Sequence, residues 1–398
     1  MASSNNKGFT MIELLISILL LSIFITILVI SINPQKTFEK SRDAARFNDL
    51  QSLSLAISTI LKQNPQISLG VTNTIYLSLV KIQSATCSDY QLPIVTSGYS
   101  YNCVATPTNI NGTGWIPIDF TLNPIFNLKN LPIDPLNSGE YFYSYKFKNK
   151  LYKFSTKFEN ERNLQISYYD GGVDPLSYEI GNNLSLYSPE NGLVIRYTFE
   201  ENTGTIAYDS SGFNFNATLN NFNFNSSSGW IAGKVGKGLI FDGIDDYLSI
   251  NYSYQTSNLK NLTVCLWLNS TSTINSSLIS FNTSSYWGLE MNSSGKINFY
   301  TKGSDGSLDL LTSKTSINDG QWHFICGTYS AISGVNKYIY IDGKVDIPKS
   351  ANNGSNLGDN SLASGVIGQN FNGLIDEILI YHKVFKPQEI NQLYLLQR

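Results

Sequence analysis

A charge-free apolar run over residues 14–32 constrains the structure of this chain more than any other feature. At about 1.5 Å per residue, a helix of this length crosses a hydrocarbon core of roughly 30 Å. A secretory signal peptide has its small-residue cleavage site after the apolar region, whereas here the small residue, Gly8, precedes it. Cleavage after Gly8 leaves the apolar helix on the mature protein, which predicts a single-pass protein of the cytoplasmic membrane.

The residues around Gly8 form a specific string, Lys-Gly-Phe-Thr-Met-Ile-Glu, which ends at Glu13. This string resembles the class III signal of type IV pilins and pseudopilins. The resemblance implies that a prepilin peptidase removes residues 1–8 and that Phe9 opens the mature chain. A lone carboxylate in lipid needs a partner. The resemblance implies that Glu13 pairs with the amino group of Phe9 in a neighbouring subunit. The alternative is an ordinary membrane anchor with a stray glutamate.

We expect one long helix over residues 9–64. Apolar residues recur at helical spacing beyond the membrane segment, and charged residues, including Asp43 and Arg46, fall largely on the opposite face. Asn33-Pro34 predicts a kink because proline removes a backbone donor. Asn64-Pro65 predicts the end of the helix. In pilins the first half of such a helix packs in the filament core and the second half lies on the head.

Residues 65–189 are predicted to form a pilin-like head with a small antiparallel sheet. Its clearest element is a hairpin in which aromatic residues alternate on both strands and residues 148–150 form the turn. The aromatic face should cover the helix. Turn-forming strings at 131–135 and 170–175 are similar to pilin-head loops, some of which bind calcium, although such turns also form without a metal.

From residue 190 to 398, short alternating strands and regularly spaced turns predict an all-β sandwich. This region resembles the laminin-G-like or concanavalin-A-like jelly roll of bacterial surface proteins. The resemblance rests on five ordered strings, at residues 192–200, 209–212, 236–248, 320–329 and 373–381. The predicted fold is therefore an α+β pilin followed by a jelly roll.

Four cysteines fall as two in each half of the chain, and none lies in a C-x-x-C pair. A zinc ribbon or redox motif is therefore unsupported. Outside the cytoplasm, two disulfides within domains are plausible, from Cys87 to Cys103 and from Cys265 to Cys326. The alternative is four buried thiols. The net charge of −3 and the dispersed lysines exclude a nucleic-acid surface that depends on bulk positive charge.

Calcium is the expected cofactor because jelly-roll relatives often join their first and last strands through this ion. The resemblance gives Glu200 and Asp376 as ligands, and Asp209 in an Asp-Ser-Ser-Gly turn as a third. In the alternative interpretation, Asp209 forms a turn, Asp376 is a hydrogen-bond acceptor at the strand end, and Glu200 is solvated.

Two neighbouring aromatic residues, Tyr286 and Trp287, lie in polar surroundings and are candidates for stacking on a sugar; a core position is the alternative. A retaining glycosidase needs two carboxyl groups about 5 Å apart. The nearest pattern, Asp242 with Asp246, is interrupted by Gly243 in a turn. We therefore expect no enzymatic activity.

Together these features predict a minor type IV pilin that displays a laminin-G-like domain on a cell-surface filament. Its partners would be other pilin subunits and an extracellular glycan or protein ligand, with a role in adhesion or recognition. A pseudopilin of a type II secretion-like system is the main alternative. A polysaccharide-active enzyme is the weaker one.

Overall fold

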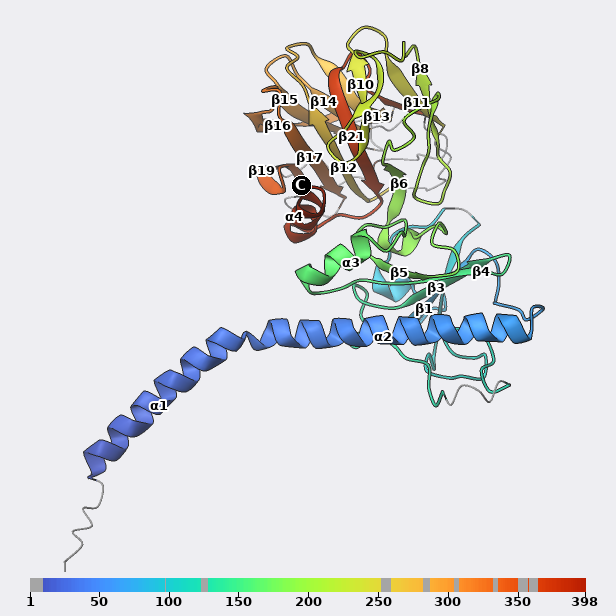
Figure 1. Ribbon diagram of the computed structural model, residues 1–398, viewed down its shortest axis with the longest axis vertical. Coiled ribbons are helices and arrows are strands. Elements are labelled where there is room, and N and C mark those ends of the chain that lie inside the picture. The colour runs from blue at the N-terminus through green and yellow to red at the C-terminus, as the bar shows by residue number, and fades with distance from the viewer. Residues whose placement is uncertain are drawn as a thin grey trace, which may run out of the picture.

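The computed structural model describes residues 10–96, 98–122, 128–251, 259–281, 287–303, 308–331, 336–349, 357 and 364–398. Figure 1 shows the order of the parts: a bent pair of helices, a small sheet that forms the head, and a large β-sandwich. The head sheet lies between the second helix and the sandwich (Figure 1). The chain is thus an N-terminal helical segment followed by a mainly antiparallel β-protein, as the sequence predicts.

The N-terminal helix is broken at the predicted position. Helix α1 spans Met11–Ile32 and helix α2 spans Pro34–Gln63, and Asn33 between them adopts φ 45° in the left-handed region. Pro34 begins α2, where a missing N–H costs least. Asn64 caps the end of α2, and its N–H donates to the carbonyl of Ile60 over 2.8 Å. Both predicted boundaries are confirmed.

Measured over the part of the chain that the structure describes, no helix is both long enough and apolar enough to span a membrane.

Helix α2 packs on the aromatic face of the head sheet, as expected. Its buried residues Leu50, Leu53 and Ile57 contact a cluster that includes Tyr145 and Phe154. Ring hydroxyl groups also reach the helix: the Tyr143 hydroxyl donates to Asp49 Oδ2 over 2.8 Å, and the Tyr152 hydroxyl donates to the carbonyl of Ser54 over 2.8 Å. These hydroxyl groups fix the register between helix and sheet.

The expectation that Asp43 and Arg46 lie on a polar, outward face is wrong. They are 1% and 0% exposed. Arg46 donates through Nε to Asp134 Oδ2 over 2.6 Å and through Nη2 to Asp134 Oδ1 over 3.0 Å, and it also pairs with Asp43 and Glu159. A buried charge is tolerated when it is paired and hydrogen-bonded in this way.

The head sheet has five strands. In spatial order they are β2 (Ser100–Val104), β1 (Thr74–Val80), β3 (Ser144–Lys148), β4 (Leu151–Thr156) and β5 (Tyr178–Gly181). The β1–β2 pair is parallel, which corrects the prediction of a wholly antiparallel sheet; the other pairs are antiparallel. Short helices η1 (Ser88–Tyr90), η2 (Glu161–Asn163) and α3 (Leu164–Tyr168) complete the head. Cys87 and Cys103 form the predicted disulfide.

The sandwich consists of two eight-stranded antiparallel sheets among the described residues. One sheet has the order β19 (Lys344–Lys349), β18 (Lys337–Ile341), β17 (Trp322–Ser330), β12 (Asn261–Asn269), β21 (Asn372–Tyr381), β10 (Lys237–Asp242) and β9 (Gly229–Ala232), with β6 (Leu193–Tyr197) also paired to β21. The other has the order β16 (Leu308–Ser316), β15 (Lys296–Lys302), β14 (Trp287–Met291), β13 (Ser276–Phe281), β20 (Ser364–Ile367), β11 (Tyr247–Asn251), β8 (Ala217–Asn220) and β7 (Ile206–Ala207).

Strand β12 is buried on both faces, which its continuous apolar sequence predicts. Val264 and Leu266 face the core between the sheets. Cys265 and Trp267 face the opposite side and pack under the C-terminal helix α4 (Pro387–Leu396). Cys265 pairs in register with Cys326 of β17, with Cα atoms 4.2 Å apart, and the two form the second predicted disulfide.

The head and the sandwich share one apolar cluster. Val173 and Leu176 of the head pack with Phe385, which lies just before α4, and with Ile390, which lies in α4. Figure 1 shows α3 and α4 side by side at this junction, and their residues are in contact. The junction is therefore a packed interface.

Candidate functional site

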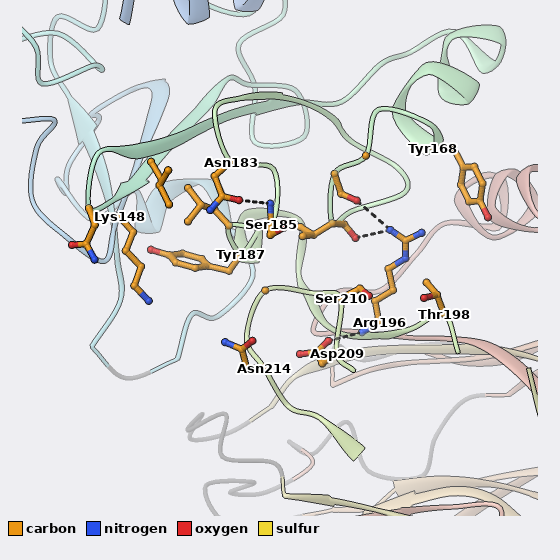
Figure 2. Close-up of a pocket in the computed structure, with 17 residues that line it drawn as sticks. Lys148, Tyr168, Asn183, Ser185, Tyr187, Arg196, Thr198, Asp209, Ser210 and Asn214 are labelled. Carbon is orange, nitrogen blue, oxygen red and sulfur yellow. Dashed lines mark hydrogen bonds between the residues drawn. The ribbon is translucent and has the colours of Figure 1, made fainter. Parts of the chain in front are cut away.

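A cleft of about 650 Å³ opens between the head and the sandwich (Figure 2). Sites for small ligands usually measure roughly 300–1,000 Å³ and often lie between domains. The head contributes the β3–β4 hairpin, the end of α3 and the segment after β5; the sandwich contributes β6 and the β7–β8 loop. The lining comprises Lys148, Asn149, Leu151, Tyr168, Gly171, Gly172, Val173, Asn183, Ser185, Leu186, Tyr187, Arg196, Thr198, Asp209, Ser210, Gly212 and Asn214.

Arg196 joins the two sides of the cleft. It lies on β6 of the sandwich, and its Nη1 donates to two carbonyls of the head, those of Gly172 over 3.3 Å and Val173 over 3.1 Å. Its Nε is buried and makes no hydrogen bond to any residue that the structure describes. The guanidinium is therefore held by one edge at the mouth of the junction, as Figure 2 shows.

Asp209 shapes the sandwich wall and leaves no carboxylate oxygen uncommitted. Its Oδ1 accepts from the backbone N–H of Arg196 over 3.0 Å and of Ser211 over 2.9 Å. Its Oδ2 accepts from the Ser211 hydroxyl over 2.7 Å and from the N–H of Phe215 over 3.0 Å. Burial raises the pKa of Asp209, and these donors oppose that shift. Asp209 thus acts as the turn former of the alternative interpretation.

Gly212 allows the sandwich loop to approach the head closely. Its φ is +91°, and a Cβ there would lie 2.6 Å from the backbone nitrogen of Tyr187 and 2.8 Å from the carbonyl oxygen of Ser185. Any side chain at this position would push the two walls apart. Tyr187 itself is buried and packs edge-on against Tyr99, with ring centroids 4.6 Å apart.

A buried charge network lies behind the head wall and holds the linker between the domains. Glu190, in the short helix η3 (Pro189–Asn191), pairs with Lys146 and accepts from the hydroxyls of Ser144 over 2.8 Å and Ser155 over 2.6 Å. Lys153 on the neighbouring strand pairs with Glu179 over 2.9 Å, and burial lowers the pKa of Lys153 to about 8. The linker is therefore fixed to the head sheet.

The lining offers amides, hydroxyl groups and two cationic side chains, which suit a polar ligand. Lys148 lies on the head side and Arg196 on the sandwich side, with Asn183 and Asn214 facing the space between (Figure 2). Sequence reasoning missed these residues as a site. Lys148 was visible only as part of a hairpin turn and Arg196 only as part of a jelly-roll string, because neither motif shows which domain surface it will meet.

The three predicted calcium ligands are not brought together. Glu200 accepts from the N–H of Lys237, the first residue of β10, over 3.2 Å, and Asp376 accepts from the N–H of Val235, in the loop between β9 and β10, over 2.9 Å. Both carboxylate oxygens of Asp209 accept hydrogen bonds within its own turn. The prediction that Asp209 belongs to this ligand set is therefore wrong. Burial raises the pKa of Asp376 to about 8.

A different acidic group has its carboxylate oxygens within 4.8 Å of one another, namely Asp242, Asp245 and Asp246. Two of these residues already stabilise the turn between β10 and β11. Asp242 accepts from the N–H of Ile244 over 2.8 Å, and Asp246 accepts from the Ser228 hydroxyl and the N–H of Asp242, each over 3.0 Å. Calcium requires six to eight oxygen ligands, so most would have to come from elsewhere.

Trp287 does not form a sugar platform. It begins β14, is 3% exposed, and stacks on Phe281 of β13 with ring centroids 4.8 Å apart. The core alternative is correct for this residue because its strand places the ring between the two sheets. Tyr286 lies outside the described residues.

At the N-terminus, Gly8 and Phe9 lie outside the described residues, whereas Glu13 is described. Thr10 and Glu13 form a capping box at the start of α1: the N–H of Thr10 donates to Glu13 Oε2 over 2.8 Å, and the N–H of Glu13 donates to the Thr10 hydroxyl over 3.3 Å. In the single chain, Glu13 therefore has a partner within its own helix.

Comparison with known families finds two separate matches. Residues 3–29 match the prokaryotic N-terminal methylation motif, and residues 242–391 match the concanavalin A-like lectin/glucanases superfamily. The chain thus carries a type IV pilin signal followed by a laminin-G/concanavalin-A-like domain. No curated protein matches this chain.

Several solved structures are similar to it. They include the binding domain of Paraclostridial mosquitocidal protein 1 (17% identity, TM-score 0.42, 51% of this chain and 52% of that chain). The receptor-binding domain of botulinum neurotoxin D is another (18% identity, TM-score 0.39, 53% of this chain and 54% of that chain). The chain covers about half the length of these solved chains.

Proposed function

We propose that this protein is a minor subunit of a type IV filament that displays a carbohydrate- or protein-binding β-sandwich on the cell surface. The observation that carries the proposal is the union, in one chain, of the methylation motif at residues 3–29 and the concanavalin-A-like domain at 242–391. The arrangement supports it, because the sandwich lies across the head sheet from α2 and away from α1 (Figure 1). A bulky sandwich suits a tip or a sparse position.

The proposed assembly begins with a precursor anchored in the cytoplasmic membrane and cleaved after Gly8 by a prepilin peptidase. The apolar side chains of α1 from Met11 to Ile25 are largely exposed in the single chain. Packing against the equivalent helices of other pilin subunits would cover them. Glu13 would then exchange its capping contacts with Thr10 for the amino group of Phe9 in a neighbour, so that one charge sets the register between subunits.

Binding, without catalysis, is the role we infer for the interdomain cleft. Its lining supplies the donors and acceptors of asparagine, serine and threonine side chains beside the charged groups of Lys148 and Arg196. Asp209 is saturated by protein donors. An uncommitted pair of carboxyl groups, which glycoside hydrolysis requires, is not among the described lining residues.

Calcium remains a subsidiary proposal, restricted to the turn that holds Asp242, Asp245 and Asp246. Calorimetric titration of the full chain with calcium tests it, with Asp245→Asn as the variant because Asp245 is exposed and the change leaves the turn's hydrogen bonds in place. Binding heat that disappears in the variant supports the site. The absence of binding heat in the wild type removes it.

The filament proposal is tested by immunogold electron microscopy of sheared surface material from cells that carry the wild type or Glu13→Ala. The wild type should label filaments, and the variant should be lost from them because the neighbour's amino group has no counter-charge. Glu161→Ala, on the exposed surface of the head, is the control and should assemble normally. Normal incorporation of Glu13→Ala contradicts the proposal. Lost protein export without labelled filaments favours the pseudopilin alternative.

A further inference from the structure

We propose that the interdomain cleft binds an anionic saccharide, with Lys148 of the head and Arg196 of the sandwich holding its carboxylate or sulfate groups from opposite sides. This inference rests on the proposed function and specifies its ligand class. It also makes the site a joint property of the two domains, because each of them supplies one of the two cations (Figure 2).

The charge of the lining supports an anionic ligand. Lys148 is exposed at the end of β3, and Arg196 is partly exposed on β6. The single carboxylate among the described lining residues, Asp209, accepts four hydrogen bonds from the protein and offers no oxygen to a cation in the cleft. The chain as a whole carries a net charge of −3, so the positive charge of the cleft lining is opposite in sign to that of the whole chain.

The acidic groups next to the cleft oppose this field only weakly. Asp170, whose carboxylate accepts from the N–H of Gly172 over 2.6 Å, has a pKa that burial raises to about 7. Glu377 interacts electrostatically with Arg196, and burial raises its pKa to about 7 as well. Burial disfavours the charged form of both carboxyl groups, which weakens the negative field that they set against Lys148 and Arg196.

Arg196 is oriented to receive a ligand. Its Nη1 is fixed by the carbonyls of Gly172 and Val173, which prevents the guanidinium from rotating away. Its Nη2 makes no hydrogen bond to any described residue, and the guanidinium lies between these two carbonyls and Tyr168, which also lines the cleft (Figure 2). A donor held in this way loses little conformational entropy when it binds an oxyanion.

The neutral residues match the rest of a sugar. Asn183 and Ser185 from the head face Ser210 and Asn214 from the sandwich, and all four line the same space. Amide and hydroxyl side chains both donate and accept hydrogen bonds, as sugar hydroxyl groups require. A volume of about 650 Å³ fits a short oligosaccharide segment.

Binding of paired probes to the full chain in detergent tests the inference. The probes are 3′-sialyllactose against lactose, and hyaluronan against chondroitin sulfate hexasaccharides, measured by calorimetry at two salt concentrations. We expect 3′-sialyllactose to bind at least about tenfold more tightly than lactose, and this preference to shrink at high salt, since salt screens exposed charges. Both hexasaccharides carry carboxylates and only chondroitin sulfate carries sulfate, so this pair shows whether an added sulfate group strengthens binding.

The variant is Lys148→Glu, with Lys81→Glu as its matched control on an exposed part of the head outside the cleft. Both exposed changes leave the core intact, so the variants should fold. Lys148→Gln should weaken binding of the acidic sugar about three- to fivefold, as for one exposed ion pair, and Lys148→Glu should weaken it more. Lactose binding should not change.

Each outcome decides the inference. Lactose binding as tight as 3′-sialyllactose binding, or equal losses in Lys148→Glu and Lys81→Glu, overturns the anionic specificity and leaves glycan binding by the protein intact. If none of the four saccharides binds, both this inference and the carbohydrate arm of the proposed function fail. Selective loss in Lys148→Glu supports both.

Discussion

Arg46 is the largest charged side chain that this fold removes completely from solvent. It forms ion pairs with Asp43 and Asp134 and shares Glu159 with Arg42. Replacement of one partner in a buried ion network leaves carboxylates without a counter-charge, which typically costs about 3–5 kcal/mol. Arg46→Met should lower the free energy of unfolding by about this amount, as measured by urea denaturation.

The control for Arg46 is Arg42, whose side chain is 28% exposed and pairs with the same Glu159. Because solvent screens a partly exposed pair, Arg42→Met should cost about 1 kcal/mol or less. Similar losses in the two variants would show that burial of the Arg46 network does not determine the stability of the contact between helix and head.

A second residue-scale prediction concerns pH. His323 contacts Asp342 through Nδ1 over 2.9 Å and Asp319 through Nε2 over 3.1 Å, and its hydrogen bond to Asp342, with help from Asp319, raises its pKa above the ordinary value of 6.5. A raised folded-state pKa means that the stabilisation is complete below about pH 6.5 and is lost as the pH rises through the folded-state value. The wild type should therefore lose stability between pH 6 and 8.

His323→Gln should remove the part of this pH dependence that His323 contributes, because glutamine does not titrate, whereas Asp170 and Glu377, whose pKa values burial raises to about 7, still titrate in this range. Urea unfolding of both proteins at pH 6 and pH 8 measures it, and the difference in stability between them should be larger at pH 6. A difference of the same size at both pH values would mean that the two aspartates do not stabilise the charged histidine.

At the scale of elements, the turn of the β3–β4 hairpin has a strained backbone, and the cost of this strain can be measured. Asn149 and Lys150 form its turn with φ values of 50° and 67°. Asparagine tolerates this left-handed region, whereas a lysine there costs about 1 kcal/mol or more relative to glycine. Lys150→Gly should therefore be more stable than Lys150→Ala by about 1 kcal/mol in chemical denaturation.

The two Lys150 variants form a matched pair, because each loses the contact of the lysine Nζ with the carbonyl of Ile67. The difference between their free energies of unfolding therefore measures the conformational cost of a side chain at a left-handed backbone position. Equal stability of the glycine and alanine variants would mean that the turn relaxes to another geometry when the lysine is removed.

Elements with local signals were predictable from the sequence. The break at Asn33-Pro34, the helix end at Asn64 and the aromatic hairpin depend on neighbouring residues alone, and all three are confirmed. Burial of Arg46 was not predictable, because its partner Asp134 lies 88 residues away. The polar sequence around Trp287 left a surface position and a core position open, and the structure decides for the core because the strand places the ring against Phe281.

At the candidate site, too, features with a local sequence signal were predictable and contacts between distant residues were not. Asp209 was predicted to lie in a turn, as well as to bind calcium, and the turn is what the structure shows. The cleft was not foreseen, because Lys148 and Arg196 come from different domains and meet only when the interface forms. Gly212, which permits this close approach, is one glycine of a common turn string and has no distinguishing sequence signal.

At the scale of the whole molecule, the junction determines whether the sandwich is an appended module or part of one unit. Tyr381 of β21 donates to Asp174 of the head over 3.1 Å, and Lys386 pairs with Glu140 over 2.8 Å. The linker residue Glu190 is 3% exposed and pairs with Lys146 in the head. A chain cut at residue 190 would expose apolar and charged groups on both sides, so we expect neither part to be fully stable alone.

Cooperative unfolding of the full chain follows from this shared core. Leu176 of the head packs in the interface cluster and is 4% exposed, whereas Leu289 lies deep in the sandwich core, on β14. Each Leu→Ala change should cost roughly 2–5 kcal/mol. Because the domains share packing and buried charges, Leu289→Ala should accelerate hydrogen exchange in the head strands β3 and β4 as well as in the sandwich. Faster exchange confined to the sandwich would show that the two domains open independently, and the cleft between them would then lack a fixed shape.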